Sequence, residues 1–163
     1  VIEGKAGFQI MGDWAKGEFT AAGKTPGVDY YCAATPSNNG YLYNVDSFIF
    51  YKSSDPDKQA GQKLLAKLMM GKNFQKVFNL YKGSIPARLD VSMDEFDKCA
   101  KTSNADIKTA GAKGGLVPSF AHGMAQGNTM KAALQDIITE HFNSDMSSVD
   151  AANALADSVL ANM

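Results

Sequence analysis

The sequence predicts an α/β fold that is rich in helices and incomplete as given. Three segments have the β-branched and aromatic residues typical of strands, and all three lie before residue 53, at 7–11, 28–34 and 41–52. Helical patterns fill the rest of the chain. A doubly wound sheet usually has more strands, and the first two segments have no obvious partners. We therefore expect one part of a larger α/β protein.

The first helix is expected between Asp13, a candidate N-cap, and Gly23, a candidate stop. It follows the short strand at 7–11. The second strand, 28–34, is separated from the clearest strand, 41–52, by the sequence TPSNNG, whose proline, asparagines and glycine predict a loop.

Two helices are expected after the third strand. Asp55 can cap the first of them, Pro56 can take its first helical position, and Gly71 can end it. The second helix, NFQKVFNLYKG, is expected to end at Gly83.

The remaining residues are expected to form three more helices. Ser92 and Glu95 fit a capping box before the segment FDKCAKTSNADIKTAG. The segments TMKAALQDIITEHF and SVDAANALADSVLANM follow, both with helical spacing of apolar residues.

Composition excludes some classes of protein. The 163 residues suffice for one sizeable domain or parts of two, and the net charge is −1. Fifteen lysines accompany one arginine, Arg88, which argues against a nucleic-acid surface. No apolar run approaches the roughly 18 residues of a membrane span. The start, VIEGKAGFQIMG, does not begin with methionine and lacks the pattern of a signal peptide, so we expect either processing or a chain cut out of something longer.

The two cysteines, Cys32 and Cys99, are 67 positions apart and form no CxxC motif. They are either two buried thiols or one disulfide, which would stabilise the fold by roughly 4 kcal/mol. A zinc site that combines them with His122 and His141 is disfavoured, because the usual ligand spacing is absent. We expect no metal and no cofactor.

Three polar or aromatic residues are candidate ligand contacts, each with a plainer alternative. Trp14 is either an anchor in the core or on the surface, or a stacking platform for a planar or sugar ring. Asp46 lies within an apolar strand, where it either faces water or accepts hydrogen bonds at a pocket edge. Lys82 lies at a helix end, where a cation suits the helix dipole.

His122 lies in the stretch LVPSFAHGMAQG. A catalytic arrangement with Ser119 and Asp46 is disfavoured, because the chain has no GxSxG elbow. His122 is then either a structural histidine or a polar ligand contact, and the residues alone do not separate these two. His141 is expected to be an exposed helix residue. We expect no catalytic residues.

Four stretches occur in one order: MGDWAKGEF, NVDSF, NLYKGSIPARLD and LVPSFAHGMA, with FDKCA between the last two. Together they resemble the C-terminal part of an ABC-transporter sugar-binding protein, in the glucose/mannose-binding branch of the periplasmic solute-binding proteins. The resemblance implies a two-lobe fold. Residues 1–37 would end the C-terminal lobe, 38–90 would return to the N-terminal lobe, and 91–163 would complete the C-terminal lobe.

The resemblance also implies roles for the candidate residues. Trp14 would stack on a sugar, while Asp46, Lys82 and His122 would hydrogen-bond its hydroxyls. Cys32 and Cys99 would form a disulfide, because exported proteins oxidise their cysteine pairs.

The same resemblance implies a periplasmic binding protein and not an enzyme. It would hold a monosaccharide, glucose or mannose, in a cleft between two lobes and deliver it to ABC permease subunits. The chain would carry only the C-terminal half of the site, so the missing N-terminal half is an expected partner and nucleic acid is not. The alternative is a structural or interaction module without sugar binding of its own.

Overall fold

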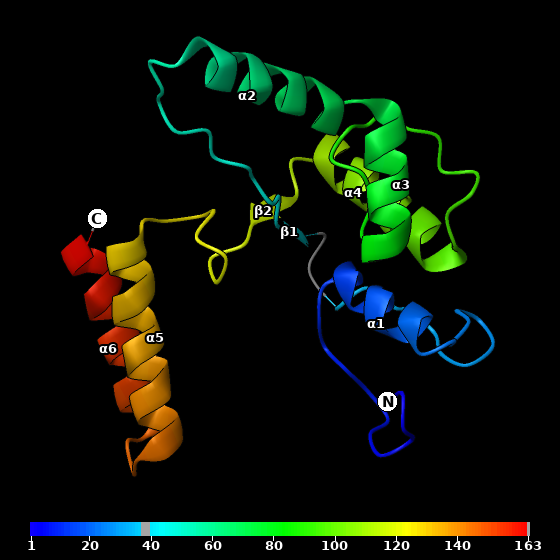
Figure 1. Ribbon diagram of the computed structural model, residues 1–163. Helices are drawn as coiled ribbons and strands as arrows, with labels where there is room; N and C mark the ends of the chain where they lie inside the picture. The colour runs from blue at the N-terminus through cyan, green and yellow to red at the C-terminus, as the bar shows by residue number, and fades with distance from the viewer. Residues whose placement is uncertain (37–39, 163) are drawn as a thin grey trace. The chain divides into compact units, whose positions relative to one another are not determined.

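The computed structural model describes residues 1–36 and 40–162, which form two compact units. Unit 1 comprises Val1–Tyr41 and Val45–Gly115, and unit 2 comprises Leu42–Asn44 and Leu116–Met163. Most of the regular structure is helical, as Figure 1 shows. No helix among the described residues has the length and apolar character needed to cross a membrane.

Unit 1 begins with a 3-10 helix, η1 (Asp13–Ala15), which continues into α1 (Lys16–Ala21). The expected role of Asp13 as N-cap is wrong, because Gly12 occupies that position. The carboxylate of Asp13 instead accepts a hydrogen bond from the backbone N–H of Ile85, at 3.1 Å. A hydrogen bond to a residue 72 positions away in the sequence therefore takes the place of the local cap.

The first two predicted strands do not form in the described residues. Phe8 and Ile10 of the first are 95% and 87% exposed, and the second contributes only an isolated bridge between Pro26 and Tyr30. A strand exists only where a neighbour satisfies its backbone N–H and C=O groups, and the described part of this chain supplies no such neighbour here.

The third predicted strand is much shorter than expected. It is β1 (Tyr41–Tyr43), and residues 44–52 are irregular. The predicted loop at 35–40 lies partly outside the described residues.

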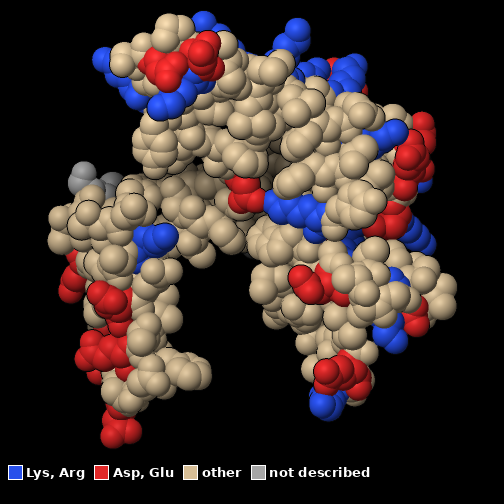
Figure 2. All heavy atoms as spheres, viewed as in Figure 1, with Lys and Arg blue, Asp and Glu red and all other residues tan. Residues whose placement is uncertain are grey.

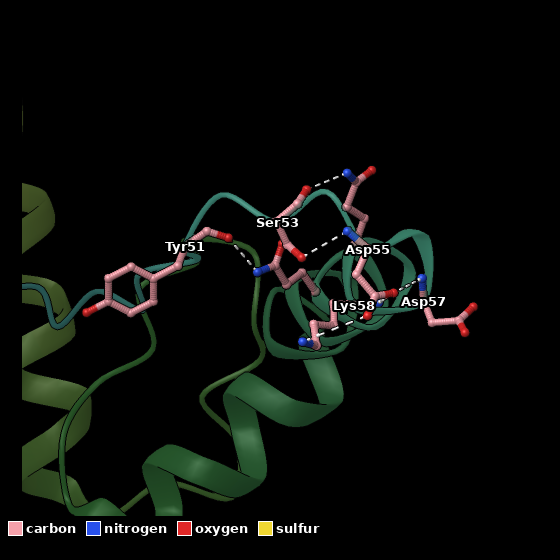
Figure 3. A network of polar contacts seen from close by, with 7 residues as sticks. Tyr51, Ser53, Asp55, Asp57 and Lys58 are labelled. Carbon is pink, nitrogen blue, oxygen red and sulfur yellow. Dashed lines mark hydrogen bonds and ion pairs between the residues drawn. The ribbon is translucent and has the colours of Figure 1, made fainter.

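Helix α2 (Pro56–Met69) begins as the sequence predicted. The carboxylate of Asp55 accepts hydrogen bonds from the backbone N–H groups of Asp57 and Lys58, at 2.9 and 3.3 Å, and Pro56 takes the first helical position. Figure 3 shows this network, in which the hydroxyl of Ser53 accepts from the backbone N–H of Asp55. The capped start separates the irregular segment from the helix.

Helix α3 (Lys72–Lys82) ends at Gly83, as predicted. Gly83 has φ +87°, and a Cβ there would lie 2.5 Å from the backbone nitrogen of Gly17 in α1. A Cβ on Gly17 would lie 2.8 Å from the carbonyl oxygen of Lys82. Two glycines therefore allow the backbone of α1 to meet the end of α3.

Helix α4 (Lys98–Ala112) starts later than expected, with Asp97 as its N-cap. The predicted capping box is wrong. The Ser92 hydroxyl binds Asp94, and Glu95 forms an ion pair with Lys76 of α3 at 2.7 Å. Asp97, five residues after Ser92, accepts from the Ala100 N–H at 2.8 Å, so the helix begins too late in the chain for Ser92 to cap it.

The centre of unit 1 joins α1, α4 and the segment between them. Lys16, only 6% exposed, forms a 2.8 Å ion pair with Asp97. The rings of Phe19 and Tyr30 pack with centroids 4.4 Å apart. Cys32 and Cys99 form a disulfide with Cα atoms 5.7 Å apart, which confirms the predicted pairing.

Unit 2 contains β2 (Leu116–Pro118), which pairs with β1 in a two-stranded sheet, and the helices α5 (Asn128–Asn143) and α6 (Ser148–Asn162). Both helices lie where the sequence predicted them, and they pack side by side (Figure 1). Residues 116–163 carry five acidic side chains and one basic side chain, Lys131. Figure 2 shows acidic side chains along this helix pair.

The predicted segments 1–37, 38–90 and 91–163 refer to the lobes of a longer protein, which the two units of this chain do not test. Residues 1–36 and most of 38–90 belong to one unit, and the chain passes to unit 2 after Gly115. The first predicted boundary, between 37 and 38, lies outside the described residues. The division into lobes of a longer protein stays a prediction.

Candidate functional site

Two of the four predicted contact residues meet in unit 1. Lys82 is the last residue of α3, and its ammonium forms an ion pair with the carboxylate of Asp46. The ammonium also lies 5.7 Å from the centroid of the Phe78 ring. The side chains of Lys82 and Asp46 are 31% and 61% exposed, so a ligand can reach both from solvent.

Asp46 differs from its expected setting. Because β1 ends at Tyr43, Asp46 lies beyond the strand and not within it. Lys82 does occupy the helix end that the sequence predicted, where a cation is favourable. The ion pair therefore links an irregular segment to the C-terminus of α3.

Trp14 lies on η1 and is partly exposed. Its six-membered ring lies against Gly12, where a Cβ would overlap it. The helix that continues from η1 touches the backbone of Lys82 through Gly17. Direct contacts within unit 1 therefore link the segments that carry Trp14, Asp46 and Lys82.

Asp13 is a further polar residue in this region, for which the sequence predicted no role in the site. Burial raises the pKa of its carboxyl group, an effect opposed by the hydrogen bond from Ile85 and by the charges of Lys16 and Lys82. Asp13 therefore ties η1 to the loop after α3, one residue before Trp14. The sequence marked Asp13 only as a cap, and no local signal points to Ile85.

His122 lies in unit 2, where it contacts Ser119. The hydroxyl of Ser119 and Nδ1 of His122 share a hydrogen bond of 2.6 Å, and Ser119 is 3% exposed. In a serine hydrolase the nucleophile contacts Nε2 and a carboxylate contacts Nδ1. Here the serine is on the other nitrogen and is buried, and the proposed third member, Asp46, is paired with Lys82. The geometry does not fit a catalytic triad.

The histidines and cysteines do not assemble into a metal site in the structure. Cys32 and Cys99 are oxidised to a disulfide and cannot act as thiolate ligands. His141, which was expected to be exposed, is only partly so, and its Nδ1 lies 2.9 Å from the carbonyl oxygen of Met146. The residues described contain no cluster of three or more potential ligand side chains.

Known proteins that are similar in sequence to this chain are named as binding proteins. No protein-family model matches it. A probable sugar-binding periplasmic protein of Brucella suis is 47% identical over 160 residues, which are 98% of this chain and 38% of that protein. A protein of the same name from Rhizobium meliloti is 43% identical over the same shares of both chains. An uncharacterised ABC transporter extracellular-binding protein of Pyrococcus horikoshii is 37% identical over 86% of this chain and 31% of that protein.

The relatives agree with several expectations drawn from the sequence. Their names describe binding proteins outside the cytoplasm, in agreement with the expected periplasmic binding protein. None of these three names specifies glucose or mannose. The chain spans less than two fifths of the length of the curated relatives it matches. It is homologous, over nearly its whole length, to a part of the sugar-binding periplasmic and ABC-transporter extracellular-binding proteins.

Proposed function

We propose that the chain supplies part of the cleft of a periplasmic binding protein that captures a monosaccharide, glucose or mannose, for an ABC importer. The observation that carries the proposal is the similarity along 98% of the chain to proteins named sugar-binding. The cleft residues on this chain are Trp14, Asp46, Lys82 and His122.

The chemistry of these side chains suits a sugar. Asp46 accepts and Lys82 donates hydrogen bonds, and hydrogen bonds to charged groups contribute about 1.5–3 kcal/mol each. The Trp14 ring offers an apolar face to the C–H groups of a pyranose. A hexose presents both donors and acceptors, so a mixed set of this kind favours it.

Exposed apolar surface in unit 1 supports a larger parent protein. A groove of about 520 Å³ between α2 and α3 is lined in part by Leu64, Leu68, Phe74 and Val77. Outside this groove, Phe48 and Ile49 are 62% and 77% exposed. Soluble proteins rarely leave extensive apolar patches uncovered, and we infer that the N-terminal half of the protein covers this surface.

In this proposal the three segments 1–37, 38–90 and 91–163 contribute to two lobes that close on the sugar about a hinge. The closed protein then docks on permease subunits in the membrane. The disulfide in unit 1 supports an oxidising compartment such as the periplasm.

Titration calorimetry on the intact protein tests the proposal, with glucose, mannose, galactose, xylose and arabinose as ligands. We expect saturable binding of glucose or mannose. Trp14→Ala should weaken it by a few kcal/mol through lost stacking area. Tyr51→Ala is the control, because it removes an aromatic side chain that is 81% exposed, on the segment before α2. If the intact protein binds none of these sugars, the alternative of an interaction module is favoured.

A further inference from the structure

The buried hydroxyl of Ser119 is held in a fixed position beside His122. The Ser119 N–H donates to the carbonyl oxygen of Tyr43 at 2.8 Å, and its own carbonyl accepts from the Met124 N–H at 3.0 Å. Backbone hydrogen bonds on both sides therefore fix this residue. Its hydroxyl lies 2.6 Å from Nδ1 of His122.

The surroundings of the hydroxyl determine the direction of this hydrogen bond. The backbone N–H of His122 donates to the Ser119 hydroxyl oxygen, at 3.4 Å. The single hydroxyl hydrogen then needs an acceptor, and with Ser119 3% exposed that acceptor must come from the protein. Among the described residues, Nδ1 of His122 is the acceptor in reach. A nitrogen that accepts carries no hydrogen, so the neutral ring carries it at Nε2.

We propose that Ser119 is a positioning residue that fixes the Nε2–H tautomer of His122, so that His122 presents a donor to an oxygen atom of the sugar. This inference rests on the proposed function. It goes further because it assigns the direction of the hydrogen bond. The sugar oxygen opposite His122 must accept, and a hydroxyl there must give its own hydrogen to another group of the cleft. A site built this way discriminates against sugars that lack or misplace that oxygen.

Nitrogen NMR of the ligand-free intact protein, labelled with ¹⁵N-histidine, tests the tautomer without any sugar. The His122 signals are assigned by their loss in His122→Gln. We expect the hydrogen on Nε2 and none on Nδ1. A hydrogen on Nδ1 would overturn the inference. In Ser119→Ala we expect a larger share of the tautomer with the hydrogen on Nδ1, because the serine hydroxyl no longer donates to that nitrogen.

Calorimetry with the sugar that the wild type binds tests the link to binding. Ser119→Ala should lower the affinity by about 3- to 10-fold, the effect of one misdirected hydrogen bond. The matched control is Ser103→Ala, whose hydroxyl is also 2.6 Å from its partner, the Tyr41 hydroxyl in unit 1, and which should bind as the wild type does. Equal affinities of the two variants would overturn the positioning role. If the wild type binds no sugar, the proposed function fails, and the NMR result still decides the tautomer.

Discussion

The two units of the chain are held together in different ways. In unit 1, the disulfide joins residues 67 positions apart, the Lys16–Asp97 ion pair joins residues 81 apart, and the Asp13–Ile85 hydrogen bond joins residues 72 apart. In unit 2, α5 and α6 pack on each other across the short connection 144–147. The Trp14, Asp46 and Lys82 part of the candidate site therefore depends on links between distant residues, whereas His122 is positioned by a neighbour three residues away.

Removal of the disulfide should have the largest effect and should be confined to unit 1. In the intact protein, Cys32→Ala with Cys99→Ala should lower the free energy of unfolding by about 4 kcal/mol, because the bond closes a long loop. Hydrogen exchange should accelerate in α4 and around residues 25–34. A reductant should reproduce the effect in the wild type and add nothing in the double variant. Equal acceleration in α5 and α6 would contradict the difference between the units.

The close approach of α1 and α3 can be tested with two glycines of positive φ. Gly83→Ala combines backbone strain with overlap on Gly17, and should lower the free energy of unfolding by about 2–4 kcal/mol. Gly114 has φ +69° but open space around the position of a Cβ, so Gly114→Ala should lose only about 1 kcal/mol. Urea unfolding measures both. Similar losses would show that the α1–α3 contact contributes little to unit 1.

Substitutions of two lysines of α3 can distinguish a residue that binds the sugar from one that only stabilises the helix. Lys82→Met should weaken sugar binding by about 10- to 100-fold, through loss of one charged hydrogen bond. Lys76→Met is the matched control, because Lys76 is 29% exposed and pairs with a 62% exposed Glu95, much as Lys82 pairs with Asp46. Calorimetry should show an unchanged affinity for it. Equal losses in both variants would remove Lys82 from the site.

Asp13→Asn should give the smallest effect, seen in the pH dependence of unfolding. Burial raises the pKa of Asp13 in the folded protein, so the folded state holds this proton more tightly than the unfolded state. The contribution of Asp13 to stability is thus complete below the usual carboxyl pKa and is lost as the pH rises through the folded value.

Denaturant unfolding of the intact wild type between about pH 3 and pH 7 should show that the free energy of unfolding falls as the pH rises. In Asp13→Asn this fall should be smaller, by less than about 1 kcal/mol. Asp136→Asn, which removes an exposed carboxylate of α5, should leave the fall unchanged. A profile that Asp13→Asn does not alter would show that the charge of Asp13 is not linked to folding.

The elements that the sequence predicted well are those fixed by their own neighbours. Asp55 and Pro56 start α2, Gly83 ends α3, and α5 and α6 lie where apolar spacing placed them. The strand predictions at 7–11 and 28–34 were wrong, because a strand also needs a partner, and local composition does not say whether one is present. The capping box at Ser92 was wrong because Asp97, two residues beyond Glu95, was the better-placed cap.

The candidate site was less predictable than the helices. Composition made Trp14 and His122 noticeable, as the single tryptophan and one of two histidines, but only the family resemblance suggested that they act together with Asp46 and Lys82. Two contacts, the Asp13–Ile85 hydrogen bond and the approach of Gly17 to Lys82, arise only when the backbone folds. Neither contact has a local pattern in the sequence. The Ser119–His122 hydrogen bond spans three residues, yet it depends on the turn and on side-chain rotamers that a sequence does not show.

The ion pair of Asp46 and Lys82 has a consequence for how a solute reaches the protein. Because the two opposite unit charges lie in contact, their fields largely cancel at distances much greater than their separation, whatever the salt concentration. This pair therefore cannot attract or repel at long range, and it acts only on a solute already in contact. A binding protein that relies on such a pair would capture an uncharged nutrient at much the same rate in fresh water and in brine.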